Sequence, residues 1–113
     1  MTERDIQAAI RLALGARRDV VLWRNNVGLA EHHGQRVRYG LTEGSADLIG
    51  LVRMASGLGR FFALEIKTLK GRLQPAQKMW LELVRDYGGF AAVVRSEDEA
   101  VAAVERCKAG EDQ

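Results

Sequence analysis

The run Phe61–Lys67 constrains the fold of this chain most, because it places two charged side chains in an otherwise apolar segment. Burying an unpaired charge costs several kcal/mol, so a chain keeps such charges inside only where they are paired, bound to a metal ion or used. Side chains alternate along a strand, and Glu65 and Lys67 therefore share one face while the opposite face is apolar. We predict a buried strand over residues 60–68 that carries a functional pair of charges.

An acidic residue, Asp47, stands at the start of the preceding apolar run. It follows the loop Gly40–Ser45 and leads a predicted strand over residues 47–53. The turn Ser56–Gly59 is short enough to join this strand to the next one as an antiparallel pair. The sequence therefore predicts that Asp47 and Glu65 lie on neighbouring strands.

The remaining pattern predicts an α/β domain with a central mixed sheet flanked by helices. Thr2 with Asp5, and Ser96 with Glu99, have the spacing of capping boxes that begin helices. Pro75 suits the first position of another helix. We expect helices over residues 3–15, 75–87 and 96–108, further strands over 20–25 and 90–95, a short hairpin or irregular edge over 28–39, and a frayed tail over 109–113.

Length and composition indicate one domain, since 113 residues suffice for a single hydrophobic core. No apolar run approaches the roughly 20 residues that cross a bilayer, and the mixed-charge N-terminus does not resemble a signal peptide. Cys107 is the only cysteine, which excludes an intrachain disulfide and favours a reducing, cytoplasmic compartment. We expect Cys107 to be a small apolar helix residue rather than a nucleophile, Trp23 and Trp80 to belong to the core rather than to stack on bases, and Tyr87 to face inward.

The net charge of +2 conceals an uneven distribution. Residues 1–78 carry 13 Lys and Arg against 7 Asp and Glu, whereas residues 79–113 carry 4 against 8. A basic surface around an acidic pocket is typical of a metal-dependent enzyme that acts on nucleic acid, although solvated arginines alone give the same counts. Our candidates for phosphate contacts are Arg36, Arg38, Lys70 and Arg72.

Asp47, Glu65 and Lys67 have the chemistry that phosphodiester hydrolysis needs. The reaction requires an activated water, neutralised charge on the phosphate and help for the leaving oxygen, and a Mg²⁺ held by carboxylates and waters serves all three. Each acid would give one oxygen, with the backbone carbonyl of Ile66 as a third ligand. Lys67 would orient the water or stabilise the developing negative charge. The alternative is a structural ion pair of Lys67 with one of the two acids.

Two polar residues on the flanking helices belong to the same end of the sheet. Glu3 begins the buried stripe of the first helix, and Gln77 stands near the start of the helix that follows Pro75. We expect both side chains to approach the two strand acids. For Glu3, an acid favoured by the helix dipole in the first turn is the alternative explanation.

A set of short motifs along the chain carries a family resemblance. The segments are Gly44–Gly50, Glu65–Thr68, Gly71–Leu73, Pro75, Gln77, Trp80, Gly89 and Val93–Ser96. In this order they resemble the VRR-NUC family, a branch of the PD-(D/E)xK nucleases, and the resemblance runs from Glu3 to about Glu99. One departure is Ala46, which stands where the family usually has a proline that shapes the backbone and is not a ligand.

The resemblance implies a restriction-endonuclease-like fold and a Mg²⁺- or Mn²⁺-dependent nuclease. By the family pattern Asp47 and Glu65 bind the metal, Lys67 is catalytic, and Glu3 and Gln77 complete the site, with Glu3 a further candidate metal ligand. Small stand-alone members occur in bacteria and phages, resemble Holliday-junction resolvases and tend to be dimers that cut branched DNA. We therefore expect a homodimeric DNA endonuclease that acts on Holliday junctions or flaps.

Two other functions are compatible with the same fold. The domain could bind nucleic acid without cutting it, or it could be a nuclease subunit that a helicase partner loads onto DNA. A degenerate binding module would be expected to have lost Asp47, Glu65 or Lys67, and all three are present. The sequence therefore favours the enzyme over the binding module.

Overall fold

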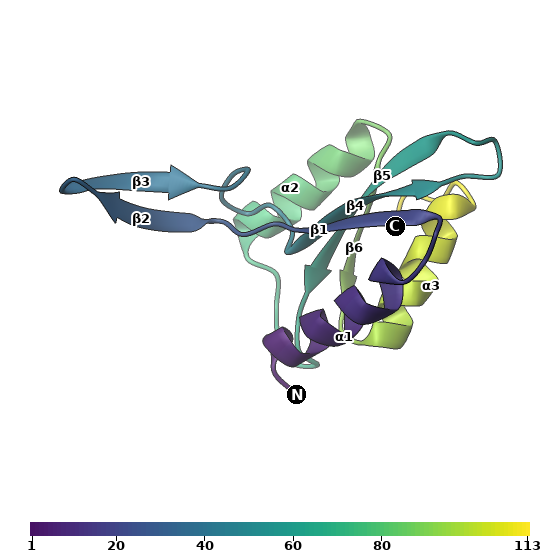
Figure 1. Ribbon diagram of the computed structural model, residues 1–113, viewed down its shortest axis with the longest axis horizontal. Helices are drawn as coiled ribbons and strands as arrows, with labels where there is room; N and C mark the ends of the chain where they lie inside the picture. The colour runs from purple at the N-terminus through teal and green to yellow at the C-terminus, as the bar shows by residue number, and fades with distance from the viewer.

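The computed structural model describes all 113 residues and contains three helices and six strands. In chain order the elements are α1 (Glu3–Gly15), β1 (Val20–Arg24), β2 (Gly28–His32), β3 (Gln35–Tyr39), β4 (Leu48–Arg53), β5 (Gly59–Ile66), α2 (Pro75–Asp86), β6 (Phe90–Val94) and α3 (Glu97–Lys108). Four strands form the main sheet in the order β1–β4–β5–β6, and β2 pairs only with β3 (Figure 1). None of the helices combines the length and hydrophobicity that a membrane span needs.

The main sheet is mixed, as predicted. β4 runs antiparallel to both β1 and β5, and a turn joins β4 to β5 as the expected hairpin. β6 pairs with β5 in parallel, because α2 crosses over between them. α1 and α3 lie on one face of the sheet and α2 lies on the other (Figure 1). The inner strand β5 is therefore covered on both faces.

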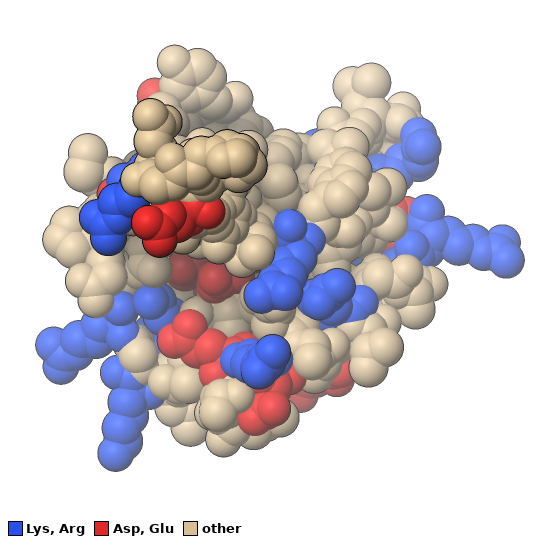
Figure 2. All heavy atoms as spheres, turned by 60° about the vertical axis from the view of Figure 1, so that its left-hand side comes forward, with Lys and Arg blue, Asp and Glu red and all other residues tan.

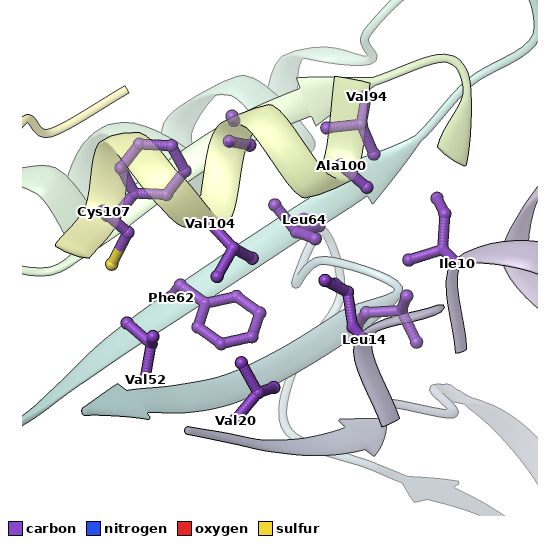
Figure 3. Packing of buried hydrophobic residues seen from close by; sticks show 14 of the residues in the cluster. Ile10, Leu14, Val20, Val52, Phe62, Leu64, Val94, Ala100, Val104 and Cys107 are labelled. Atoms are coloured by element: carbon purple, nitrogen blue, oxygen red, sulfur yellow. The ribbon is translucent and has the colours of Figure 1, made fainter. Parts of the chain in front are cut away.

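The larger hydrophobic core lies between the main sheet, α1 and α3 (Figure 3). Phe62, Leu64 and Ile66 belong to it from β5, at alternate positions of the strand. On the other face Ala63 packs in a smaller cluster with Leu81 of α2. The alternation predicted for β5 is confirmed, because successive residues belong to two different cores.

Glu65 and Lys67 are the only charged residues buried in the domain. They follow Ala63 at alternate positions on the α2 face and are 2% and 8% exposed. The predicted burial of these two charges on a shared face is confirmed.

The predicted capping boxes are confirmed in one helix and only half confirmed in another. At α1, Thr2 Oγ1 accepts a hydrogen bond from the Asp5 N–H at 3.1 Å, and the Asp5 carboxylate accepts one from the Thr2 N–H at 3.1 Å. At α3, Ser96 Oγ accepts from the Glu99 N–H at 3.1 Å. The Glu99 carboxylate instead accepts from the N–H of Arg95 at 3.0 Å. The second bond of the predicted capping box, from the Ser96 N–H to the Glu99 carboxylate, is therefore wrong, because this carboxylate binds the N–H of the preceding residue.

Two aromatic residues that we expected inside lie at the surface. Trp23 on β1 is 49% exposed, and Tyr87 at the end of α2 is 83% exposed. α2 packs on β5 and β6 only, so the same face of β1 and β4 has no helix over it. Trp80 does pack against the cluster around Ala63, and Cys107 is a helix residue, as expected, and is buried in α3.

The C-terminal tail after α3 is tied to the domain. The N–H of Ala91 on β6 donates to the carbonyl of Asp112 at 3.1 Å, and the Arg60 guanidinium donates to the carbonyls of Cys107 and Glu111. The fraying of residues 109–113 stays a prediction, and the structure shows that β6, as an edge strand, offers the tail a backbone partner.

The hairpin of β2 and β3 projects from the body of the domain (Figure 1). We call residues 28–39 the arm. Its strands pair in register along their whole length, and the turn at His33–Gly34 has positive φ at both residues. Beyond Gly28, every residue of the arm is exposed. Of the two structures considered for this segment, the regular hairpin is the correct one.

Candidate active site

Asp47 and Glu65 face each other across β4 and β5. The register pairs Leu48 with Leu64, so the next pair along is Asp47 with Glu65. Directly opposite residues of an antiparallel pair project to the same face. In addition, Asp47 Oδ2 accepts a hydrogen bond from the Ile66 N–H at 2.8 Å. The structure thus brings the two predicted acids together at the end of β5.

The Glu65 carboxyl group is both buried and electrostatically disfavoured as an anion. The pKa of Glu65 is raised to about 8, first by burial and then by the charge of Asp47 and a hydrogen bond with that acid. The Lys67 charge opposes this rise, and Glu3 contributes to it. Glu65 Oε2 is buried without a hydrogen-bond partner. A buried oxygen of this kind is rare in folded proteins and is explained most simply by a ligand.

Lys67 is buried directly after β5, the strand that carries Glu65, and has no salt-bridge partner. The ion pairs of the domain lie elsewhere, on Arg17, Arg38 and Lys108. The structural ion pair of Lys67 with Asp47 or Glu65 is therefore not what the chain forms. The ammonium group acts on Glu65 through space, by lowering the pKa of that carboxyl.

A polar pocket of about 360 Å³ opens beside the two acids, and we call it the acidic pocket. On the face turned forward in Figure 2, acidic atoms lie in a hollow with Lys and Arg side chains around it. The pocket is lined by the two strand acids, by residues of α1 and α2, and by the segments directly before and after the arm. Its lining residues are Gln7, Arg24, Asn25, Asn26, Val27, Glu43, Gly44, Ser45, Asp47, Glu65, Gln74, Ala76 and Gln77.

Gln77 reaches the acidic pocket from the first turn of α2, as predicted. Its Oε1 accepts a hydrogen bond from the Gln74 N–H at 2.9 Å, so the amide oxygen caps the helix. This leaves the amide nitrogen, which is a hydrogen-bond donor, as the end of the side chain that can meet a ligand.

Glu3 lies near the site but in a separate recess. With Asp47 and Ile66 it lines a pocket of about 240 Å³ that shares Gln7 and Arg24 with the acidic pocket. Its side chain is exposed, and no group of three or more His, Cys, Asp or Glu side chains is arranged to hold a metal ion. The structure therefore brings Glu3 to the expected end of the sheet without placing it in a carboxylate cluster.

Sequence reasoning missed Asn25, which fixes the loop in front of Asp47. Its Nδ2 donates to Ser45 Oγ at 2.7 Å and to the Ala46 carbonyl at 2.8 Å, and its N–H donates to the Asp47 carbonyl at 2.8 Å. These bonds hold the backbone that presents the Asp47 carboxylate. The only signal in the sequence is a polar residue at the end of an apolar strand, which does not reveal a partner 20 residues away.

Arg95 is a second positioning residue that the sequence did not reveal. Its Nη1 donates to the Thr68 carbonyl at 2.5 Å and to the Gly71 carbonyl at 2.8 Å. The exposed side chains of Lys70 and Arg72 extend from the loop that these bonds hold. Two of the four candidate phosphate contacts therefore sit on a fixed segment directly after the strand of Glu65.

The other two candidates, Arg36 and Arg38, lie on β3 of the arm and are exposed. They are two residues apart and so project from the same face of the hairpin. Arg38 forms an exposed ion pair of 3.5 Å with Glu43, which contributes little to stability. The four side chains that we expect to contact phosphate thus form two groups, one on the arm and one on the loop before α2.

Gly44 packs the loop before Asp47 against α2, and we expect Gly44→Ala to destabilise the domain. Its φ is +89°, and an added Cβ would lie 2.6 Å from the Ala76 carbonyl oxygen. The positive φ alone costs an alanine roughly 1–2 kcal/mol, and the backbone clash adds to that. Gly57→Ala is the matched control, because Gly57 has φ +92° with nothing within 4 Å. Denaturant unfolding should show a larger loss for Gly44→Ala, and equal losses would contradict the packing role.

Comparison with known proteins supports the resemblance seen in the sequence. The family model described as the VRR-NUC domain matches residues 1–98. No curated protein and no solved structure matches the chain. The matched range contains all strands of the main sheet and every candidate site residue from Glu3 to Gln77.

Proposed function

Because the chain belongs to the VRR-NUC family and carries its nuclease-type domain on a restriction-endonuclease-like fold, we propose that it is a metal-dependent endonuclease of branched DNA. It would hydrolyse phosphodiester bonds in Holliday junctions or flaps, with Mg²⁺ or Mn²⁺ as cofactor. The observation that carries this proposal is the pairing of Asp47 with Glu65, whose buried Oε2 has no partner in the protein.

The donor atoms of the site suit a hard divalent cation. Mg²⁺ and Mn²⁺ prefer oxygen ligands, and Asp47 and Glu65 offer carboxylates to the acidic pocket. The backbone carbonyl of Ile66 is the third proposed ligand, and Glu3 is a further one from the adjoining recess. A cation would also offset the like charge of Asp47 that helps to raise the pKa of Glu65. Because the acids form no cluster of three, we expect water to complete the coordination.

The residues around the acidic pocket would have separate roles in the reaction. When bound, the cation would neutralise phosphate charge and supply a water of lowered pKa. Lys67 has a positive charge without a salt-bridge partner, and we assign it the stabilisation of negative charge that develops on the phosphate. Gln77 can donate a hydrogen bond from its amide nitrogen and would orient the attacked phosphate or the water. Asn25 acts indirectly, because it fixes the backbone of Asp47.

Symmetric cleavage of a branched substrate requires two active sites. One protomer presents one acidic pocket. We therefore include a homodimer in the proposal, with a two-fold axis that relates the two pockets.

A cleavage panel tests the proposed function. The full-length protein is incubated with linear, nicked, flap and four-way DNA in Mg²⁺ or Mn²⁺, with EDTA as the metal-free control. We expect cuts in flap or four-way DNA only when metal is present. Binding without cutting under every condition would favour the non-catalytic binding module. Cutting that appears only when a helicase is added would favour a subunit that needs a loading partner.

The proposed phosphate contact at Arg72 predicts a salt signature. Arg72→Ala should weaken binding to all DNA structures about equally and reduce the slope of log K against log[salt] by about 1. Fluorescence anisotropy over a salt series measures this slope. Arg53→Ala is the control, because Arg53 is exposed at the far end of β4 from Asp47. An unchanged slope for Arg72→Ala would place that side chain outside the DNA contact.

A further inference from the structure

One face of the main sheet is only half covered. α2 packs over β5 and β6, and on the same face β1 and β4 present exposed apolar side chains. Leu83 and Tyr87 of α2 add two more, and with Phe61 they line an apolar groove of about 450 Å³ between α2 and β5. We call this surface the bare face, and its large exposed residues are Val21, Trp23, Leu51, Leu83 and Tyr87.

The arm has an apolar face that also lacks a partner. Its register pairs Gly28 with Tyr39 and Ala30 with Val37, so these four residues share one face, while the arginines of β3 project from the other. Such alternation is typical of strands with one buried face. Both faces of the arm are nevertheless exposed in the protomer. A two-stranded hairpin alone in water is marginally stable, so a partner surface over its apolar face would stabilise the arm.

The arm does not cover the bare face of its own protomer. Its root is held in place by close backbone contacts: Gly40 has φ +89°, and a Cβ there would lie 2.4 Å from the Asn26 carbonyl oxygen. Gly44 packs as closely on Ala76 of α2. From this fixed root the arm projects away from the main sheet (Figure 1). The partner of the arm therefore has to be a second molecule.

Charge and area favour a second copy of this chain as that molecule. The apolar face of the arm contains no charged residue, and Arg53, at the far end of β4, projects from the same face as Leu51 at the margin of the bare face. A surface that is apolar apart from its margin suits contact with protein rather than with DNA. If each copy lays its arm on the other, the two large side chains of the arm and the five of the bare face become buried. If each of these side chains buries about 100 Å², together they bury roughly 700 Å² per protomer. This area is close to the ~800 Å² per partner of a standard interface.

We propose that the arm of each protomer lies across the bare face of a second copy, in a closed two-fold dimer. This inference rests on the dimer of the proposed function and specifies its interface. Asn26 and Glu43, on either side of the arm's root, both line the acidic pocket. Exchange of arms therefore fixes the separation and orientation of the two acidic pockets. The opposite face of each arm, with Arg36 and Arg38, stays free to contact DNA.

Cysteine cross-linking tests the exchange, because Cys107 is buried whereas Val37 and Leu51 are exposed. Val37→Cys and Leu51→Cys proteins are mixed, allowed to exchange subunits and treated with a short bis-maleimide. We expect covalent dimers from the mixture and several-fold fewer from either variant alone. The matched control replaces Leu51→Cys by Ala102→Cys, since Ala102 is exposed on α3 across the sheet. Cross-links in the control at the same yield would overturn the proposal.

Sedimentation of the wild type without DNA or metal gives a second readout. We expect a dimer at micromolar concentration, and a monomer with unchanged far-UV circular dichroism for Val37→Glu. A monomeric wild type would overturn the proposal, as would a dimer that Val37→Glu leaves intact or one in which Val37→Cys links chiefly to itself. None of these measurements involves cleavage, so failure of the interface and failure of the nuclease function are distinguished.

Discussion

Replacing Asp47 by asparagine is expected to lower DNA cleavage by roughly 10²–10³-fold or more while leaving DNA affinity nearly unchanged. The substitution removes a negative charge that we propose holds the cation. It keeps an oxygen that can accept the hydrogen bond from the Ile66 N–H, so β4 and β5 stay aligned. The proposed phosphate contacts lie on the arm and on the loop before α2, and none of them lines the acidic pocket. The loss should therefore appear in the cleavage step and not in binding.

Single-turnover cleavage of a four-way junction in Mn²⁺, with protein in excess, isolates that step from binding. Fluorescence anisotropy on the same DNA in Ca²⁺ or EDTA reports affinity. Glu82→Gln is the matched control, because Glu82 is an exposed acid on α2 outside the acidic pocket. If Asp47→Asn cuts at the rate of the wild type, the site is assigned to the wrong residues.

Local patterns in the sequence were sufficient to predict the main sheet and the two charged residues buried against it. The alternation along β5 placed Glu65 and Lys67 on one face, and the short turn before that strand set its pairing with β4. Both features depend on neighbours in the chain and on the period of a strand. The surface position of Trp23 depends instead on how far α2 extends over the sheet. No residue near Trp23 contains that information, so an aromatic residue in a strand was wrongly expected in the core.

In the candidate site, too, the features set by neighbouring residues could be predicted, whereas those set by residues distant in the chain could not. Its acids could be predicted because each stands at a recognisable place: Asp47 at the start of a strand and Glu65 within an apolar one. Gln77 was predicted to reach the site, but its bond to the N–H of Gln74 shows that the amide oxygen is already used to cap the helix. Asn25 and Arg95 went unrecognised because their partners are distant in sequence. Supporting residues of this kind become visible only when the fold brings the two segments together.

Replacing Glu65 by glutamine is expected to abolish cutting and, in metal-free protein, to stabilise the fold at alkaline pH. The folded protein raises the pKa of Glu65 from 4.5 to about 8. Below pH 4.5 the carboxyl is protonated in both the folded and the unfolded chain. Between that pH and about 8 only the unfolded chain releases the proton, so the free energy of unfolding falls as the pH rises, in total by about 5 kcal/mol. A neutral amide at this position does not titrate, and the variant escapes the fall.

Urea unfolding in EDTA at several pH values between 4 and 9 measures this difference. Wild type and Glu65→Gln should be similar in stability near pH 4 and diverge as the pH rises, whereas Glu82→Gln should follow the wild type. Added Mg²⁺ or Mn²⁺ should restore stability to the wild type at pH 8.5 and have little effect on Glu65→Gln, because a cation that binds only the folded state stabilises it by mass action. Parallel pH profiles for wild type and Glu65→Gln would show that the buried carboxyl is not held protonated. In that case Glu65 would not lower the stability of the metal-free protein, and its burial would give no support to the proposed metal site.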